Sequence, residues 1–353
     1  MAVPKHRPAL DAIPAYKPGR AAATEAFKLS SNENPFPPLP GVIEQAVTEL
    51  GRMNRYPDAG TVALREALAE HLGVEARQIA TGTGSVAVLF ALLNAYLSPG
   101  DEIVYAWRSF EAYPIAADLT GATPVRVPLL PDGRHDIPAM GAAVTDRTRV
   151  VLVCTPNNPT GPIVTADELT TLLDRVPDDV LVVVDEAYVE FVREPQACSG
   201  TAALAEHDNV VVLRTFSKAY GLAGLRVGYA IAHPEVAEAI SKVVPPFSVS
   251  DVASAAAIAS LQAFDELAER VDQVVAERRS LRDSLIGQGW KVPDAQGNFV
   301  WLPLGPEAMD FAAACDPISV RPFDGDGVRI SIGEAGADAR FLERAAAWCD
   351  RLS

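Results

Sequence analysis

One lysine has the surroundings needed for covalent chemistry with a phosphorylated aldehyde. Lys218 follows a β-branched run at residues 211–215 that is typical of a strand. Its amine can form a Schiff base with an aldehyde. The hydroxyls of Thr215 and Ser217, and the guanidinium of Arg226 beyond a glycine-rich turn, can hold a phosphate. These residue types and their spacing indicate a site for a phosphate-bearing carbonyl cofactor.

Two more valine-rich runs end in polar residues that suit the same cofactor. Residues 149–154 lead to Asn158, and residues 180–184 lead to Asp185 and Tyr188. Continuous apolar runs of this length, alternating with helical patterns, are typical of buried parallel strands. Ligands of open α/β sheets bind beyond the carboxyl ends of the strands. We therefore expect these three side chains to converge with the lysine in one crevice.

A pyridoxal ring would give each of these residues a role. Asp185 would keep the pyridine nitrogen protonated, which makes the ring an electron sink, and Tyr188 and Asn158 would hydrogen-bond the ring hydroxyl. Lys218, once displaced by a substrate amine, would become the catalytic base. Taken singly, Asp185 could also cap a helix, residues 158–161 could form only a turn, and the lysine could lie on the surface.

A glycine-rich turn at residues 82–86 (Gly-Thr-Gly-Ser-Val) precedes an apolar helix predicted over 86–97. Helix N-termini bind anions, so we expect the Ser85 hydroxyl and the Val86 amide to contact the phosphate. The turn also fits the motif of dinucleotide-binding dehydrogenases. That motif requires an acidic residue after the next strand, whereas Asp101 and Glu102 precede it.

The combined motifs at 158–161, 185–188, 217–218 and Arg226 resemble those of fold-type I aminotransferases dependent on pyridoxal 5'-phosphate. Residues 29–35, 55–58 and 327–330 are similar to the histidinol-phosphate aminotransferase branch, and the resemblance spans nearly the whole chain. It implies an α/β fold, in which a large domain with a mostly parallel, doubly wound sheet is joined to a smaller α+β domain.

The resemblance also implies roles for residues that spacing alone does not single out. Tyr56 would reach the cofactor phosphate of a neighbouring subunit, so the protein would be a homodimer with active sites at the subunit interface. Phe110 would stack on the ring, and Arg329 would bind the substrate carboxylate or phosphate together with Asn158. Arg321 and Tyr16 are implied as further substrate contacts.

The chain departs from the histidinol-phosphate pattern at residues 106–113 and at the pair Val86-Ala87. Both departures resemble actinobacterial aromatic (phenylalanine) aminotransferases. We therefore expect amino transfer between phenylalanine, tyrosine or tryptophan and a 2-oxo acid such as 2-oxoglutarate, with histidinol phosphate as the alternative substrate. Arginine binds carboxylate and phosphate alike, so Arg329 does not separate the two. Arg329 could instead form an ion pair with Asp326 or Glu334.

A non-catalytic module of the same fold would be expected to lose Lys218 or Asp185, and both are present. Lys and Arg number 30 against 46 Asp and Glu, a formal charge of −16 that disfavours nucleic acid and anionic membranes. The scattered histidines and four separated cysteines predict no metal site and no disulfide. The start lacks an apolar signal region and no apolar helix is long enough to span a bilayer, so we expect a cytoplasmic protein.

The 353 residues, 49% of them hydrophobic, suffice for two domains. Residues 1–40 are proline-rich and predict an arm associated with the small domain. Residues 41–244 alternate between helix and strand and predict the large domain. A Val-Val-Pro-Pro-Phe break follows, and residues 245–353 predict the small domain, with one long helical stretch at 251–287 and a strand pair at 298–304 and 327–332.

Overall fold

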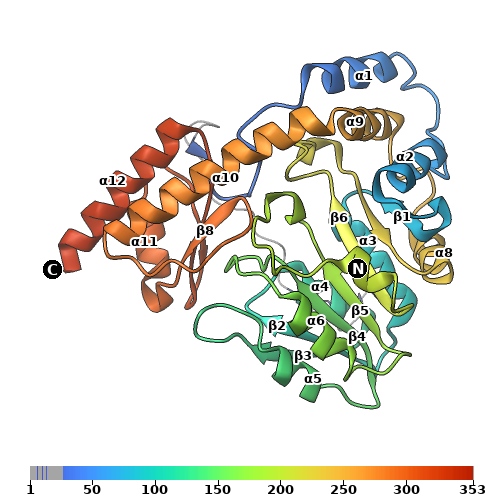
Figure 1. The fold of residues 1–353 in the computed structure, drawn as a ribbon, viewed down its shortest axis with the longest axis horizontal. Helices are drawn as coiled ribbons and strands as arrows, with labels where there is room; N and C mark the ends of the chain where they lie inside the picture. Colours follow the sequence, from blue (N-terminus) through green and yellow to red (C-terminus); the bar gives the residue numbers. More distant parts are fainter. Residues whose placement is uncertain (1–5, 7–9, 11–12, 14–26, 353) are drawn as a thin grey trace, which may run out of the picture.

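The computed structural model describes residues 6, 10, 13 and 27–352. The larger of its two sheets has seven strands, and it lies in the right-hand part of Figure 1. The spatial order of the strands is β1-β7-β6-β5-β4-β2-β3. All neighbouring pairs are parallel except those that involve β7, which is antiparallel to both β1 and β6. The strands are β1 (Ile79–Gly82), β2 (Glu102–Trp107), β3 (Thr123–Pro128), β4 (Thr148–Cys154), β5 (Leu181–Asp185), β6 (Val210–Thr215) and β7 (Gly228–Ile231).

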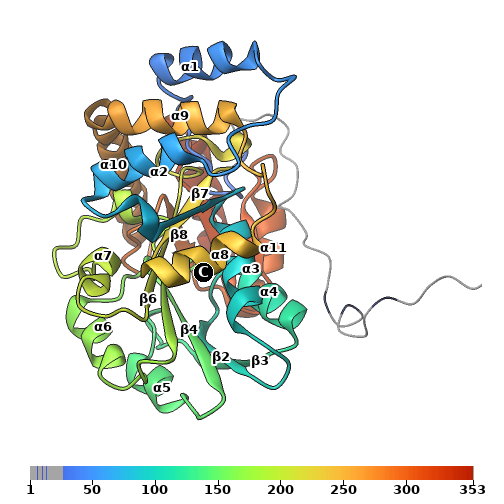
Figure 2. The same cartoon turned by 90° about the vertical axis from the view of Figure 1, so that its right-hand side faces the viewer.

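Helices cover both faces of this sheet. Figure 2 shows α3, α4 and α8 on one side and α5, α6 and α7 on the other. These helices are α3 (Ser85–Tyr96), α4 (Ala112–Thr120), α5 (Ile137–Ala142), α6 (Ala166–Leu173), α7 (Gly200–Leu204) and α8 (Pro234–Val243). This doubly wound arrangement confirms the predicted α/β fold.

The valine-rich strands are buried on both faces because successive side chains point to opposite sides of a strand. In β4, Val150 and Leu152 pack toward α3 and α4, while Val151 and Val153 pack into the core on the other face. All four are at most 1% exposed. The continuous apolar runs in the sequence are thus the physical consequence of a sheet with two covered faces.

A second, antiparallel sheet has the order β8-β10-β9. Its strands are β8 (Phe299–Leu302), β9 (Arg321–Phe323) and β10 (Gly327–Ser331), and α11 (Ala308–Ala314) and α12 (Ala335–Leu352) accompany it. The sequence predicted β8 and β10 but not the three-residue β9. Residues 27–32 lie along this sheet, since the Leu29 N–H donates to the Ser319 carbonyl and the Ser331 N–H donates to the Leu29 carbonyl.

The helical stretch predicted over 251–287 is two helices, α9 (Asp251–Gln262) and α10 (Phe264–Gly287). The chain bends at Ala263, whose φ of −100° and ψ of 30° are not helical. α9 packs against α1 (Pro40–Leu50) and α2 (Val62–Leu72), whereas α10 crosses to the second sheet (Figure 1). The domain boundary at 244/245 stays a proposal, with α9 lying on the side of the first sheet. No helix in the described part of the chain is long and apolar enough to cross a membrane.

Candidate active site

A cavity of about 330 Å³ lies beyond the carboxyl ends of the parallel strands. β4 and β5 end side by side, with Cys154 opposite Asp185, and the loop after β6 carries Lys218. Most of the predicted site residues line this cavity: Ser85, Val86, Phe110, Asn158, Asp185, Tyr188, Thr215, Ser217, Lys218, Arg226, Arg321 and Arg329. The structure therefore brings together residues that are up to 244 positions apart in the chain.

Asp185 is buried at the end of β5 with one carboxylate oxygen engaged. Its Oδ2 accepts a hydrogen bond of 2.8 Å from the Tyr113 hydroxyl. Its Oδ1 is buried and has no hydrogen-bond partner among the described residues. Burial raises the pKa of Asp185 to about 6, and the Tyr113 hydrogen bond opposes this rise. A protonated ring nitrogen at Oδ1 would satisfy the unpaired oxygen and hold the carboxylate ionised.

Lys218 directs its amine toward the N-terminal segment. Nζ donates to the carbonyl oxygens of Ser31 and Asn32, both at 3.2 Å. Burial, and then the positive charge of Arg329, lower the pKa of Lys218 to about 7, while Glu33 opposes this shift. A substantial fraction of the amine is therefore neutral near pH 7, which is the form that attacks a carbonyl or accepts a proton.

Tyr188 is also buried, and burial raises its pKa to about 12. The phenol consequently keeps its proton and can donate it to a ring hydroxyl or phenolate oxygen. Asn32 Nδ2 donates to Tyr188 Oη at 3.0 Å, and Ser331 Oγ donates to Asn32 Oδ1 at 2.9 Å. This chain of hydrogen bonds connects β10 to the loop that follows β5 and fixes the Tyr188 ring.

Three positioning residues were not predicted from the sequence. Asn34 Nδ2 donates to the Lys218 and Ala219 carbonyls at 3.3 and 2.8 Å, and Asn32 and Tyr113 hold Tyr188 and Asp185. Each contact joins segments more than 70 positions apart. The available signals were the similarity of residues 29–35 and of residues 106–113 to known motifs, and neither similarity carries geometry.

The residues predicted to hold a phosphate lie together at the start of α3 and at Arg226. Gly84 has a φ of 89°, and a Cβ there would lie 2.5 Å from Arg226 Nη2. A Cβ on Gly228 would lie 2.3 Å from the Ser85 nitrogen. Both glycines thus permit the close approach of the helix N-terminus and the guanidinium. Arg226 Nη1 donates to Ser217 Oγ at 3.3 Å, which places the hydroxyl and the cation together.

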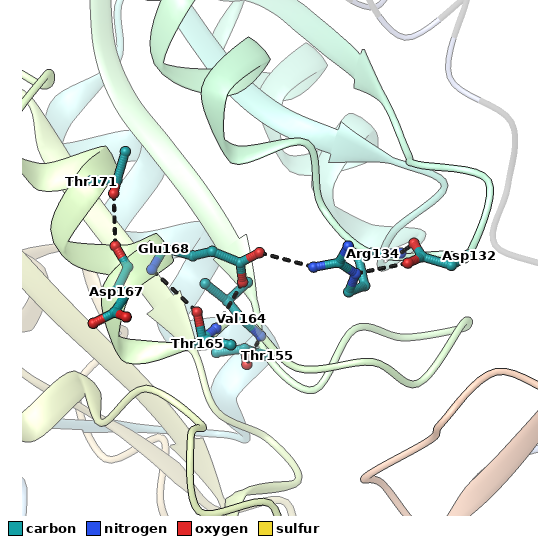
Figure 3. A network of polar contacts seen from close by, with 8 residues as sticks. All are labelled: Asp132, Arg134, Thr155, Val164, Thr165, Asp167, Glu168 and Thr171. Atoms are coloured by element: carbon teal, nitrogen blue, oxygen red, sulfur yellow. Dashed lines mark hydrogen bonds and ion pairs between the residues drawn. The ribbon is translucent and has the colours of Figure 1, made fainter.

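The loop that carries Asn158 is closed at its base. The Val164 N–H donates to Thr155 Oγ1 at 2.9 Å (Figure 3). The next residue, Thr165, caps α6 through a reciprocal pair of hydrogen bonds with Glu168, and Glu168 also binds Arg134 at 3.1 Å. The network shown in Figure 3 therefore anchors both ends of the loop. Asn158, which belongs to this loop, lines the cavity.

Arg329 is 7% exposed and reaches the cavity from β10. Nη1 donates to Asn158 Oδ1 at 2.5 Å and Nη2 donates to the Ser30 carbonyl at 2.7 Å. Asp326, one alternative partner from the sequence, instead pairs with Arg108, whose Nε lies 2.7 Å from its carboxylate. Arg329 thus lies beside Asn158, where a substrate carboxylate is expected.

The two aromatic residues predicted to contact the cofactor, Phe110 and Tyr56, lie in different places in a single chain. Phe110 lines the cavity and contacts Tyr113 edge-on, with ring centroids 5.6 Å apart. Tyr56 does not line the cavity; it is 82% exposed and packs on Phe247 at 4.9 Å. Tyr16 lies outside the described residues. The implied role of Tyr56 needs a second subunit.

The residues present fit pyridoxal 5'-phosphate. The unpaired Asp185 Oδ1 suits the ring nitrogen, Tyr188 and Asn158 suit the ring oxygen, and the cradle at Ser85 and Arg226 suits the phosphate. In the described part of the chain no group of histidine, cysteine and acidic side chains could hold a metal ion.

Comparison with known proteins agrees with this geometry. The sequence model of the family described as aminotransferase class I and II matches residues 24–333. The chain is 56% identical over 345 residues to an aromatic amino acid aminotransferase of Streptomyces avermitilis and 54% identical to one of Streptomyces coelicolor, with 96% of each chain covered. The crystal structure of histidinol-phosphate aminotransferase from Sinorhizobium meliloti in complex with pyridoxal-5'-phosphate has a TM-score of 0.90 at 27% identity, covering 100% of this chain and 99% of that one.

The unpaired Asp185 oxygen predicts opposite effects of Asp185→Asn on apoprotein stability and on cofactor binding. The pKa of Asp185 is about 6 in the folded protein and 3.8 ordinarily, so ionisation favours the unfolded state. The resulting loss of stability grows between about pH 4 and 6 and is complete above pH 6. At pH 7.5 the free energy of unfolding of the Asp185→Asn apoprotein should therefore exceed that of the wild-type apoprotein by about 1–3 kcal/mol. This gain should disappear at pH 4.

Thermal unfolding with and without pyridoxal phosphate measures both effects. Asparagine can still accept the Tyr113 hydrogen bond, so the variant changes charge with little change in shape. The cofactor should raise the Tm of the variant much less than that of the wild type. Equal cofactor stabilisation of both proteins would mean that Asp185 does not contact the ring.

The pKa of Lys218 predicts how cofactor capture depends on pH. Only the neutral amine attacks an aldehyde, so the rate of capture by apoprotein should rise about tenfold per pH unit below pH 7 and level off above it. Stopped-flow absorbance with pyridoxal measures this rate, because pyridoxal lacks the phosphate whose own ionisation falls near pH 6. A rate that keeps rising to pH 10 would show an ordinary, solvated lysine.

Proposed function

The chain belongs to the class I and II aminotransferases, and from this premise we propose that it uses pyridoxal 5'-phosphate to move an amino group between an aromatic L-amino acid and a 2-oxo acid such as 2-oxoglutarate. Two aromatic amino acid aminotransferases at 54–56% identity over nearly the full length support the aromatic substrate. The cavity supports it independently, since Phe110 and Phe323 line it.

The observation that carries the substrate class is the ion pair of Arg321. Its Nη2 lies 2.7 Å from Glu111 Oε2, and both residues line the cavity. A phosphate-bearing substrate such as histidinol phosphate would need cations free to bind a dianion. A guanidinium already bound to a carboxylate suits an uncharged ring better, and it can pack over aromatic groups.

The proposed roles follow from the geometry. Arg329 binds the α-carboxylate, and Asn158 orients it. Bound pyridoxal phosphate supplies the aldehyde that takes the amino group and a ring that accepts the electrons left at the substrate Cα. Lys218 Nζ, with a pKa of about 7, accepts the proton that leaves Cα. Asp185 keeps the ring nitrogen protonated, and Tyr188 donates its proton toward the ring oxygen.

The half-reaction tests this function directly. Holoenzyme is mixed separately with phenylalanine, tyrosine, tryptophan and histidinol phosphate, without a 2-oxo acid, and the visible absorption of the bound cofactor is followed. The aromatic amino acids should bleach it at least about 10 times faster per unit concentration than histidinol phosphate, a difference of about 1.4 kcal/mol or more in transition-state binding. The reverse order would favour the histidinol-phosphate reaction.

A homodimer belongs to the same proposal. Apolar side chains are exposed on α1 and in the segments beside it, among them Val47 at 59%, Met53 at 74% and Tyr56 at 82%. α1 forms the outer edge of the molecule, next to α9 (Figure 1). Exposed apolar patches of this kind usually bind a protein surface. A second copy would cover the patch and bring Tyr56 toward another active site.

Light scattering coupled to gel filtration measures the assembly. The holoenzyme should have twice the mass of one chain, and Val47→Glu should reduce that mass by placing a carboxylate in the apolar patch. Met309 is exposed to a similar extent, 51%, on α11. Met309→Glu is therefore a matched control and should leave the mass unchanged. A monomeric wild-type holoenzyme would contradict the proposal.

A further inference from the structure

Two arginines enter the cavity side by side from the antiparallel pair β9 and β10. Arg321 lies directly opposite Arg329 in the register, and both line the cavity. Side chains of residues directly opposite each other lie on one face, with Cβ atoms about 5 Å apart. Like charges in this position repel each other, so the positions of nearby acceptors decide which guanidinium can receive a substrate.

The two arginines have different partners. Arg329 donates to two neutral oxygens, Asn158 Oδ1 and the Ser30 carbonyl. Arg321 forms an ion pair with the carboxylate of Glu111, at 2.7 Å. The side chains of that pair are 12% and 32% exposed, so water screens it only in part.

Glu111 lies in the segment between β2 and α4, beside the first sheet, whereas Arg321 belongs to β9 of the second sheet. Glu111 directly precedes α4 and follows Phe110, the aromatic residue in the cavity wall. It makes no capping hydrogen bond to α4, so its carboxylate has no such helical role. The guanidinium of Arg321 lies 5.7 Å from the Phe323 ring centroid, and this packing holds it on the sheet.

We propose that Glu111 determines the specificity for the substrate side chain: it binds Arg321 inside the cavity and withholds that guanidinium from the substrate, so that an uncharged aromatic side chain is preferred over an acidic one. This inference rests on the proposed aminotransferase function and adds the residue that selects the substrate. An acidic side chain, including that of an acceptor such as 2-oxoglutarate, would meet the Glu111 carboxylate and would have to displace it from Arg321. An aromatic side chain leaves the ion pair intact and packs beside Phe110.

Glu111→Gln tests the inference because it removes the charge and keeps the shape. The half-reaction rates are measured with L-phenylalanine and L-glutamate. Both have the α-carboxylate that Arg329 is proposed to bind, and they differ in the charge of the side chain. The ratio of kcat/KM for glutamate to that for phenylalanine should rise about 10- to 100-fold in the variant, the effect expected of one hydrogen bond to a charged group.

Two further variants separate this role from a general charge effect. Asp326→Asn removes the charge from another ion pair between the same two regions, Arg108 with Asp326, and neither residue lines the cavity. It should leave the ratio within about twofold of the wild type. The double variant Glu111→Gln, Arg321→Gln should not show this rise in the ratio, because it lacks the guanidinium that would bind the acidic side chain.

Each outcome decides the inference. An unchanged ratio in Glu111→Gln, an equal rise in Asp326→Asn, or a gain that persists in the double variant would overturn it. Circular dichroism and the visible cofactor band check that each variant is folded and loaded. A wild-type enzyme that reacts with no aromatic amino acid would instead contradict the proposed function, and that reaction is measured first.

Discussion

The enclosure of Asp185, which is buried, and Lys218, which is half-buried, in one cavity is the constraint on which the rest of the site depends. Desolvation disfavours the charged form of each group, raising one pKa to about 6 and lowering the other to about 7. The fold tolerates these groups because Tyr113 and two backbone carbonyls supply part of their hydrogen bonding. Asp185 Oδ1 has no hydrogen-bond donor among the described residues, and a protonated ring nitrogen would supply one. The Lys218 amine could bond to an aldehyde. This arrangement destabilises the empty protein, and under the proposed function a bound cofactor would offset that cost.

A second constraint is the concentration of positive charge in an acidic protein. The chain has a formal charge of −16, yet four basic side chains line the cavity: Lys218, Arg226, Arg321 and Arg329. Backbone geometry places them. Glycine at 84 and 228 admits Arg226 to the start of α3, and the register of β9 and β10 sets Arg321 beside Arg329. The result is a local site for anions, in which Glu111 forms an ion pair with one of the arginines, Arg321.

The sequence predicted those parts of the fold and site that depend on local pattern. Valine-rich runs marked the parallel strands, and strand ends placed Asn158, Asp185 and Lys218 at one edge. The contacts of Tyr113, Asn32 and Glu111 were not predictable in this way, because each depends on tertiary distances between segments far apart in the chain. The bend at Ala263 was also missed, since alanine favours helix and no proline or glycine marks the break there. The three-residue strand β9 is too short for a periodic signal.

The most direct test of the account is to find where the cofactor is bound. Holoenzyme is treated with borohydride, which reduces an imine to a stable amine, then digested, and the labelled peptide is identified by mass spectrometry. The account predicts a pyridoxyl group on Lys218 alone, in a 1:1 ratio to the chain. Attachment to a different lysine, or no attachment in protein supplied with pyridoxal phosphate, would contradict it.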